Sequence, residues 1–154
     1  MIRLAEKRDI PQIGKLLEQV NRVHYEGRPD LFKLGRKYTD EELEEILADD
    51  TRPILVFADA DDLVCGYAFC IFQQHKNSHL MTDVRTLYID DLCVDETMRG
   101  KHIGRALYEA VVVFAKEHGC YNLTLNVWSC NEGAIRFYEA CGLRPQKIGM
   151  EQIL

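Results

Sequence analysis

Apolar residues recur three and four positions apart in four segments of the chain. The pattern is clearest after Ile103, where apolar side chains return at this spacing as far as Ala115. An amphipathic helix has this period, because 3.6 residues make one turn. We therefore predict helices that begin near Asp9, at Thr39, near Ile103 and at Asn131.

Residues that favour helix ends support these boundaries. Asp9 is followed by Pro11, and proline is favoured in the first turn because an N–H has no partner there. Thr39 and Glu42 form a capping-box pattern. Gly142 follows the last predicted helix, and glycine commonly ends helices in a left-handed conformation. These signals limit each helix to the segment between them.

Short apolar runs between turn residues predict the strands. We expect them at residues 2–5, 54–58, 63–72, 84–94 and 122–128, with a final strand or two in the tail from Leu143. The predicted order is β-α-α-β-β-β-α-β-α-β. This order indicates an α/β fold with a mixed central sheet of six to seven strands and helices on both faces.

The composition agrees with a single domain over residues 1–154. The sequence is 47% hydrophobic and 29% charged, which provides apolar material for a core and charge for solubility. Charges interrupt residues 1–9, whereas a secretory signal needs an apolar stretch of about 7–15 residues. Apolar runs such as 110–115 are far shorter than the ~20 residues that span a bilayer. We expect a cytoplasmic protein with no membrane partner.

Net charge, cysteines and histidines indicate which partners and ligands the protein is not expected to bind. The formal net charge is -6, and nucleic acid usually attracts basic surfaces, so we expect no nucleic acid as a partner. The six cysteines are scattered through apolar segments without a Cys-x-x-Cys pair, which favours reduced core thiols. His75 and His79 have no further ligand at suitable spacing, so we expect no metal.

Residues 89–107 combine the end of a predicted strand, a loop with glycines and the start of the clearest helix. Acidic side chains occupy positions 90, 91, 95 and 96, and basic side chains follow at 99, 101 and 105. The first backbone N–H groups of a helix have no partner within it, and the helix dipole adds positive charge there. We therefore predict that a phosphate group binds to this loop.

Two common signatures of nucleotide enzymes are absent. The sequence has neither Gly-x-x-x-x-Gly-Lys-Ser/Thr nor Gly-x-Gly-x-x-Gly after its first strand. It therefore lacks the loops typical of nucleotide hydrolysis and of dinucleotide redox chemistry. A nucleotide-binding module without transferase activity is one alternative that these observations leave open.

The loop resembles the coenzyme-binding motif of the GNAT superfamily of acetyltransferases. That motif, Arg/Gln-x-x-Gly-x-Gly/Ala, matches residues 99–104, except that His102 stands where the first motif glycine is expected. The second family signature, Asn-x-x-Ala-x-x-Phe-Tyr-x-x-x-Gly-Phe/Leu, is met by Asn131, Ala134, Phe137, Tyr138, Gly142 and Leu143. The resemblance covers nearly the whole chain in element order and implies an acetyl-CoA-dependent N-acetyltransferase.

The resemblance also implies how the cosubstrate acetyl-CoA is held, without a metal. The pantetheine arm would lie between the fourth and fifth strands, which splay apart, and would pair with backbone groups of Leu92, Cys93 and Val94. The pyrophosphate would rest on the amides of Arg99, Gly100, Lys101, His102, Ile103, Gly104 and Arg105. Asn131 would help to hold the coenzyme near the fifth strand.

An amine acceptor must lose a proton before it attacks. An alkyl amine with a pKa near ~10.4 is protonated at pH 7, and its deprotonation costs roughly 4.6 kcal/mol. A carboxylate can accept this proton, and Asp90 and Asp91 lie beside the expected thioester. Strand alternation places Asp91 on the face of Ile89 and Cys93 and Asp90 on the opposite face. Resemblance to polyamine-type relatives favours Asp90 as the base, with Asp91 next and Glu26 behind.

The remaining chemistry follows from the resemblance. In the family, the tyrosine of the second signature protonates the departing thiolate, which assigns this role to Tyr138. A backbone N–H near Cys93 would polarise the thioester carbonyl. Relatives transfer the acetyl group by direct attack in a ternary complex, which argues against an acetylated Cys93.

The acceptor itself stays open between a polyamine or other small amine, an amino acid, an antibiotic and a peptide N-terminal amine. Segment 24–37 covers the acceptor in relatives, which implies Tyr25 and Glu26 as substrate-binding residues. Homodimers are common in the family, so a homodimer is possible here. The alternative function is a non-catalytic acyl-CoA-binding sensor or regulatory domain.

Overall fold

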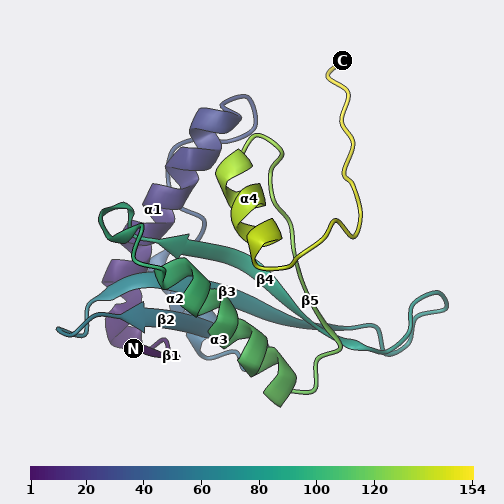
Figure 1. The fold of residues 1–154 in the computed structure, drawn as a ribbon, viewed down its shortest axis with the longest axis horizontal. Helices are drawn as coiled ribbons and strands as arrows, with labels where there is room; N and C mark the ends of the chain where they lie inside the picture. Colours follow the sequence, from purple (N-terminus) through teal and green to yellow (C-terminus); the bar gives the residue numbers. More distant parts are fainter.

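The computed structural model describes residues 1–154 and contains one five-stranded sheet in the order β1-β2-β3-β4-β5 (Figure 1). The strands are β1 (Ile2–Leu4), β2 (Ile54–Ala58), β3 (Val64–Gln74), β4 (Arg85–Val94) and β5 (Asn122–Leu125). The helices are α1 (Ile10–Gly27), α2 (Asp40–Leu47), α3 (Ile103–Glu117) and α4 (Glu132–Ala140). Neighbouring strands are antiparallel except β4 and β5, which are parallel. The predicted mixed α/β sheet is therefore confirmed.

The helix ends follow the signals in the sequence. The Thr39 hydroxyl accepts a hydrogen bond from the N–H of Glu42 at 3.2 Å, and the Glu42 side chain accepts one from the N–H of Thr39 at 3.1 Å. Gly119 and Gly142 follow α3 and α4 with φ values of 70° and 99°. Glycine adopts these left-handed conformations without a steric cost, so each helix can end there.

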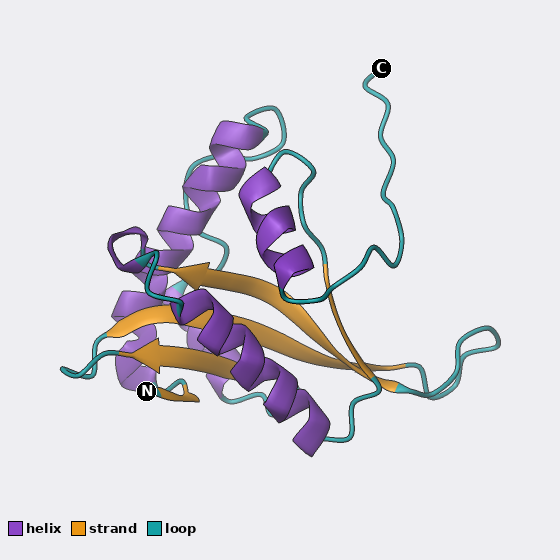
Figure 2. Ribbon diagram, viewed as in Figure 1, coloured by secondary structure: helices purple, strands orange, loops and turns teal.

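Helices cover both faces of the sheet, as predicted (Figure 2). α1 and α2 pack on one face over a core of twelve buried residues, which includes Leu17, Tyr67 and Phe69. α3 packs on the other face over a second core that includes Leu87 and Val111. Truncating one such side chain, as in Leu87→Ala, costs about 2–5 kcal/mol. None of the four helices combines the length and apolar character needed to cross a bilayer.

A β-bulge at Asp90 interrupts the alternation of β4. Asp91 pairs with Phe69 and Ile89 pairs with Cys70, so Asp90 is the extra residue. Ile89 lies in the core beneath α3, whereas the side chains of Asp90 and Asp91 both contact groups on the α1 and α2 side. The prediction that the two carboxylates point to opposite faces is therefore wrong, because a bulge shifts the alternation by one residue.

β4 and β5 pair over four residues and then separate. The parallel register runs from Thr86 with Asn122 to Ile89 with Leu125. Beyond this point β5 continues toward α4, while β4 runs toward α1 (Figure 1). Residues 90–94 therefore have no strand partner on the β5 side of the sheet. This is the separation of the fourth and fifth strands that the resemblance implies.

The tail from Leu143 does not form the predicted final strand. The sheet has five strands rather than six to seven, and the order of elements ends with α4. No backbone group of residues 144–154 makes a hydrogen bond within the chain. The apolar residues of the tail match a strand pattern, but a strand also needs a neighbour for its backbone groups.

Candidate active site

The loop between β4 and α3 presents backbone donors that have no partner. None of the N–H groups from Arg99 to Arg105 donates a hydrogen bond within the chain, and the first bond of α3 runs from Ala106 N to His102 O at 3.0 Å. The dipole of α3 adds positive charge at the same place. A phosphate group could accept several of these bonds at once. The geometry therefore agrees with the predicted anion site.

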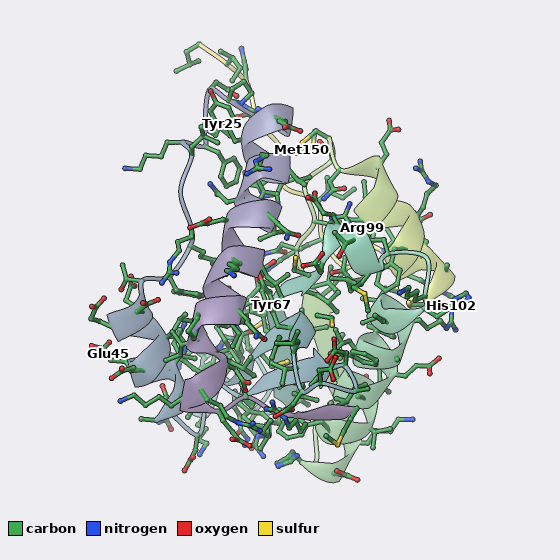
Figure 3. All side chains as sticks on the ribbon, turned by 90° about the vertical axis from the view of Figure 1, so that its left-hand side faces the viewer. Tyr25, Glu45, Tyr67, Arg99, His102 and Met150 are labelled. Carbon is green, nitrogen blue, oxygen red and sulfur yellow. The ribbon has the colours of Figure 1, made fainter.

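His102 has the backbone conformation that favours glycine in this loop. Its φ and ψ are 61° and 19°, which is the left-handed helical region, and Gly100 has a φ of 81°. Histidine is one of the few residues besides glycine that are enriched in this region. The side chain lies with Arg99 on the side of the molecule away from α1 (Figure 3). The substitution in the motif thus leaves the loop in a left-handed turn.

Gly104, the second glycine of the motif, lies where α4 meets the start of α3. A Cβ atom at this position would lie 3.4 Å from the ring of Phe137 and 3.6 Å from a methyl group of Val94. These are ordinary van der Waals distances, so alanine, which the motif also allows, would fit here as well.

The segment before α2 holds Asp90. Lys37 Nζ donates to Asp90 Oδ1 at 2.9 Å, and the Tyr38 hydroxyl donates to Oδ2. Arg52 in turn donates to the Tyr38 oxygen at 3.1 Å. Burial, followed by the Asp90 carboxylate, raises the pKa of Tyr38, so its hydroxyl stays protonated. Both carboxylate oxygens have a donor, and Asp90 thereby ties this segment to β4.

Asp91 has different surroundings. Its Oδ2 accepts a hydrogen bond from the Tyr67 hydroxyl at 2.8 Å, and no second side chain is hydrogen-bonded to it. Burial raises the pKa of Asp91 to about 6, although the Tyr67 bond and the charge of Lys37 oppose the rise. Asp91 as a residue keeps some exposed surface, whereas Tyr67 is fully buried. A carboxyl group with this pKa is mostly ionised at pH 7 and can accept a proton.

α4 brings Tyr138 to the same end of β4. Asn131 begins the helix, because its side-chain oxygen accepts a hydrogen bond from Ala134 N at 3.2 Å. Burial, and then the nearby charge of Asp91, raises the pKa of Tyr138. The phenol is therefore protonated at neutral pH. Tyr138 is available as a proton donor near a carboxylate.

Cys93 lies on β4, two residues after Asp91, and is a poor nucleophile. The residue is 5% exposed, and burial raises the pKa of its thiol to about 12. The thiol donates to the carbonyl oxygen of Leu16 at 3.7 Å. The thiolate is the reactive form of cysteine, and it is scarce here at neutral pH. The backbone of Cys93, with its neighbours Leu92 and Val94, faces the gap that opens between β4 and β5.

Tyr25 and Glu26, the two residues predicted to bind the acceptor, lie at the end of α1, and their role stays a prediction. Tyr25 and Glu26 belong to the last turn of α1, where Glu26 is exposed and Tyr25 is half-buried. Figure 3 shows Tyr25 near the end of α1 and away from Tyr67. The structure therefore does not bring this pair to the carboxylates.

Three residues that sequence reasoning missed contact the carboxylates instead. They are Lys37, Tyr38 and Tyr67. Lys37 and Tyr38 directly precede the capping residue Thr39, and that position is the only sequence signal for them. Tyr67 lies on β3, and its place opposite the carboxylates depends on the pairing of β3 with β4.

Comparison with known proteins supports the resemblance to the GNAT acetyltransferases independently of the two motifs. The family model described as Acetyltransferase (GNAT) family matches residues 19–143. A tetramutant of the BH1408 protein from Bacillus halodurans is 34% identical, with a TM-score of 0.95 over 100% of this chain and 99% of that one. An aminoglycoside N-acetyltransferase in complex with CoA is 16% identical, with a TM-score of 0.74 over 100% of this chain and 98% of the other, and so shares the fold.

Curated relatives match over shorter segments. Glucosamine 6-phosphate N-acetyltransferase of Arabidopsis thaliana is 34% identical over 65 residues, which are 42% of this chain and 42% of that protein. The chain spans less than half the length of the curated relatives it matches, between 23% and 46%.

Proposed function

Because the chain belongs to the acetyltransferase (GNAT) family, we propose that it transfers the acetyl group of acetyl-CoA to a primary amine by direct attack in a ternary complex. The observation that carries this proposal is a convergence at the end of β4. The unpaired amides of residues 99–105 follow the strand, and the Asp91 carboxylate lies on it. α4, which carries Tyr138, lies against the start of α3, where Phe137 faces Gly104. A phosphate site and a proton acceptor thus lie along β4, and the helix of the proposed proton donor packs beside them.

The coenzyme would bind along β4 and over the start of α3. Backbone groups of Leu92, Cys93 and Val94 face the gap between β4 and β5, where the pantetheine arm can pair with them. The pyrophosphate would accept hydrogen bonds from the amides of residues 99–105. Asn131 would act by holding the start of α4 beside the coenzyme.

Asp91 is the better candidate for the base. Asp90 accepts hydrogen bonds on both oxygens, and one donor is the cationic Lys37. Donors of the chain itself thus occupy both oxygens of Asp90. Asp91 has a single side-chain donor, Tyr67, and a pKa of about 6. A general base is most effective when its pKa lies near the working pH, so we assign the amine proton to Asp91.

The acyl transfer then needs no covalent enzyme intermediate. The neutral amine nitrogen attacks the thioester carbonyl carbon, and a backbone N–H near Cys93 stabilises the developing oxyanion. As the carbon–sulfur bond breaks, the attacking nitrogen releases its second proton to solvent water, and the leaving thiolate takes a proton from the Tyr138 hydroxyl. Tyr138 recovers its proton from solvent, and Asp91 releases the proton taken from the amine.

The charges near the acceptor favour an amine without a phosphate group. The cation that contacts the carboxylates, Lys37, is paired with Asp90. A phosphate on the acceptor would have to compete with Asp90 for this cation. We therefore propose a small cationic amine as the acceptor, and glucosamine 6-phosphate, named in the relatives, is the alternative to test.

The test is a measurement of free CoA thiol and of acetylated product. Purified protein is mixed with acetyl-CoA and, separately, a polyamine, an aminoglycoside, an amino acid, a peptide and glucosamine 6-phosphate. We expect thiol release that depends on the amine and initial-rate lines that intersect when both substrates are varied. Binding of acetyl-CoA without turnover of any amine would favour the sensor function, and parallel lines would contradict direct attack.

A further inference from the structure

The chain places an amine of its own in the candidate active site. Lys37 lies between α1 and α2, and its Nζ donates to Asp90 Oδ1 at 2.9 Å and to the carbonyl oxygen of Asp90 at 3.4 Å. Asp90 is the bulge residue of β4 and directly precedes Asp91, the proposed base. A primary amine of the protein therefore lies at the part of β4 where the acceptor amine is proposed to react.

This position distinguishes Lys37 from Lys7, the other lysine that forms an ion pair. Lys7 pairs with Glu44 at 3.3 Å, and the two side chains are 78% and 53% exposed. The Asp90 side chain is only 13% exposed, whereas the Lys37 side chain keeps 43% of its surface exposed. Lys37 thus extends from the surface of the molecule into the site, while Lys7 stays at the surface.

The surroundings of Lys37 allow its amine to leave Asp90. Residues 28–39 contain neither an α-helix nor a strand, and the lysine amine is carried by a flexible four-carbon stem. An ion pair with a partly exposed partner contributes little to stability. The Tyr38 hydroxyl still donates to Asp90 Oδ2 when Lys37 moves, so the carboxylate keeps one donor. The amine is therefore free to turn toward a thioester bound beside residues 92–94.

We propose that Lys37 is a site of self-acetylation, at which the chain transfers the acetyl group of acetyl-CoA to its own Nζ when no other amine is bound. This inference rests on the proposed function, because the same donor and the same base serve both amines. The occupant of the acceptor position in the free protein is then the protein's own lysine.

The transfer follows the same steps as the proposed reaction. One proton of the Lys37 ammonium passes to Asp91, and the neutral nitrogen attacks the thioester carbonyl carbon. As the carbon–sulfur bond breaks, the nitrogen releases its second proton to solvent water, and the leaving thiolate takes a proton from Tyr138. The products are an amide at Lys37 Nζ and free CoA.

The modification changes the acceptor side of the site. Acetylation removes the positive charge of a lysine and its ability to form an ion pair. Asp90 Oδ1 then loses its donor, whereas Tyr38 still donates to Oδ2. Self-acetylation thus makes one oxygen of a mostly buried carboxylate available to a cationic group of an acceptor.

The first test maps the acetylated residues by mass spectrometry after incubation of the full chain with acetyl-CoA and no added amine. We expect one acetyl group on Lys37, with a first-order rate constant that saturates with acetyl-CoA and does not depend on protein concentration. Lys33, an exposed lysine in the same segment, is the internal control. It should react about 10²-fold more slowly, because it has no positioned base.

Two variants sharpen this measurement. Lys37→Arg keeps a cation for Asp90 but provides no amine, and it should gain only the slow modification of residues such as Lys33. Asp91→Asn should slow the acetylation of Lys37 and leave that of Lys33 unchanged. Equal rates at Lys33 and Lys37, or a rate constant that rises with protein concentration, would overturn transfer within one chain.

An assay of the same preparation with added amines separates this inference from the proposed function. An acceptor amine should slow the acetylation of Lys37 with an inhibition constant close to its KM, because both amines use one site. Acetylation of Lys37 that a saturating acceptor does not slow contradicts the inference. A chain that acetylates an added amine but never Lys37 overturns the self-acetylation alone, and a chain that acetylates neither overturns both proposals.

Discussion

The proposed coenzyme side and the proposed acceptor side of β4 are built from different parts of the chain. On the proposed coenzyme side, the groups are backbone amides of residues 99–105 and the free edge of β4. On the acceptor side, they are side chains that surround two carboxylates, and their donors come from the segment before α2 and from β3. A site made of backbone N–H groups tolerates substitutions that keep the conformation of the turn. A site made of side chains loses its contacts when a single hydroxyl, amine or carboxyl group is removed.

The largest expected effect distinguishes the roles of the two adjacent carboxylates in proton transfer. Asp91→Asn removes the proposed base, and we expect kcat/KM for the amine to fall by about 10²–10⁴-fold. Asp90→Asn is the matched control, because it changes the neighbouring carboxyl group and should act mainly on the acceptor KM. Calorimetry should show that both variants bind acetyl-CoA like the wild type. A larger loss in Asp90→Asn than in Asp91→Asn would reverse the assignment of the base.

The next effect tests the proton donor. Tyr138→Phe keeps the ring that packs in α4 and removes only the hydroxyl, so we expect kcat to fall by about 10²-fold, the low end for general acid catalysis. A thiolate leaves tolerably without help, and some activity should therefore persist. The measurement is the steady-state rate of CoA release at saturating substrates. An unchanged kcat, with chemistry shown to limit the rate, would exclude Tyr138 as the acid.

A smaller effect concerns the residue that positions Asp91. The Tyr67 hydroxyl stabilises the ionised carboxylate, so Tyr67→Phe should raise the pKa of Asp91 above about 6. The base is active when ionised, and the acidic limb of the kcat/KM profile should therefore move to higher pH, by up to about one pH unit. A merely structural role would instead lower the rate equally at every pH.

The smallest effect tests the backbone character of the coenzyme side. His102→Gly keeps the left-handed conformation, so we expect the affinity for acetyl-CoA to change little. His102→Val places a β-branched residue in that conformation, which costs roughly 1–2 kcal/mol. Thermal unfolding and calorimetry of the two variants would measure the difference. If His102→Gly loses affinity strongly, the imidazole itself contacts the coenzyme.

The features that the sequence predicted correctly depend on neighbours along the chain. The capping box at Thr39, the turn before α3 and the helix that carries Tyr138 are local patterns, and the structure contains all three. The family assignment also rests on two continuous motifs, and it is confirmed. The roles of Leu92, Asn131 and the other site residues stay predictions.

The features that the sequence did not predict depend on pairing between distant segments. The bulge at Asp90 arises from the register of β4 with β3, and it turned both carboxylates to one side. Lys37 and Tyr67 reach these carboxylates only through the tertiary fold. The missing final strand has the same cause, since the apolar pattern around Ile148 predicts a strand but not the edge that it needs.

The most direct test of the account is a calorimetric titration of the full chain with acetyl-CoA, with acetyl-pantetheine, ATP and NAD as controls. If the amides of residues 99–105 hold the pyrophosphate and β4 pairs with the pantetheine arm, acetyl-CoA should bind specifically, with one site per chain. Acetyl-pantetheine, which lacks the pyrophosphate, and ATP and NAD, which lack the pantetheine arm, should bind far more weakly. No binding of acetyl-CoA, or equal binding of ATP, would contradict the proposed site.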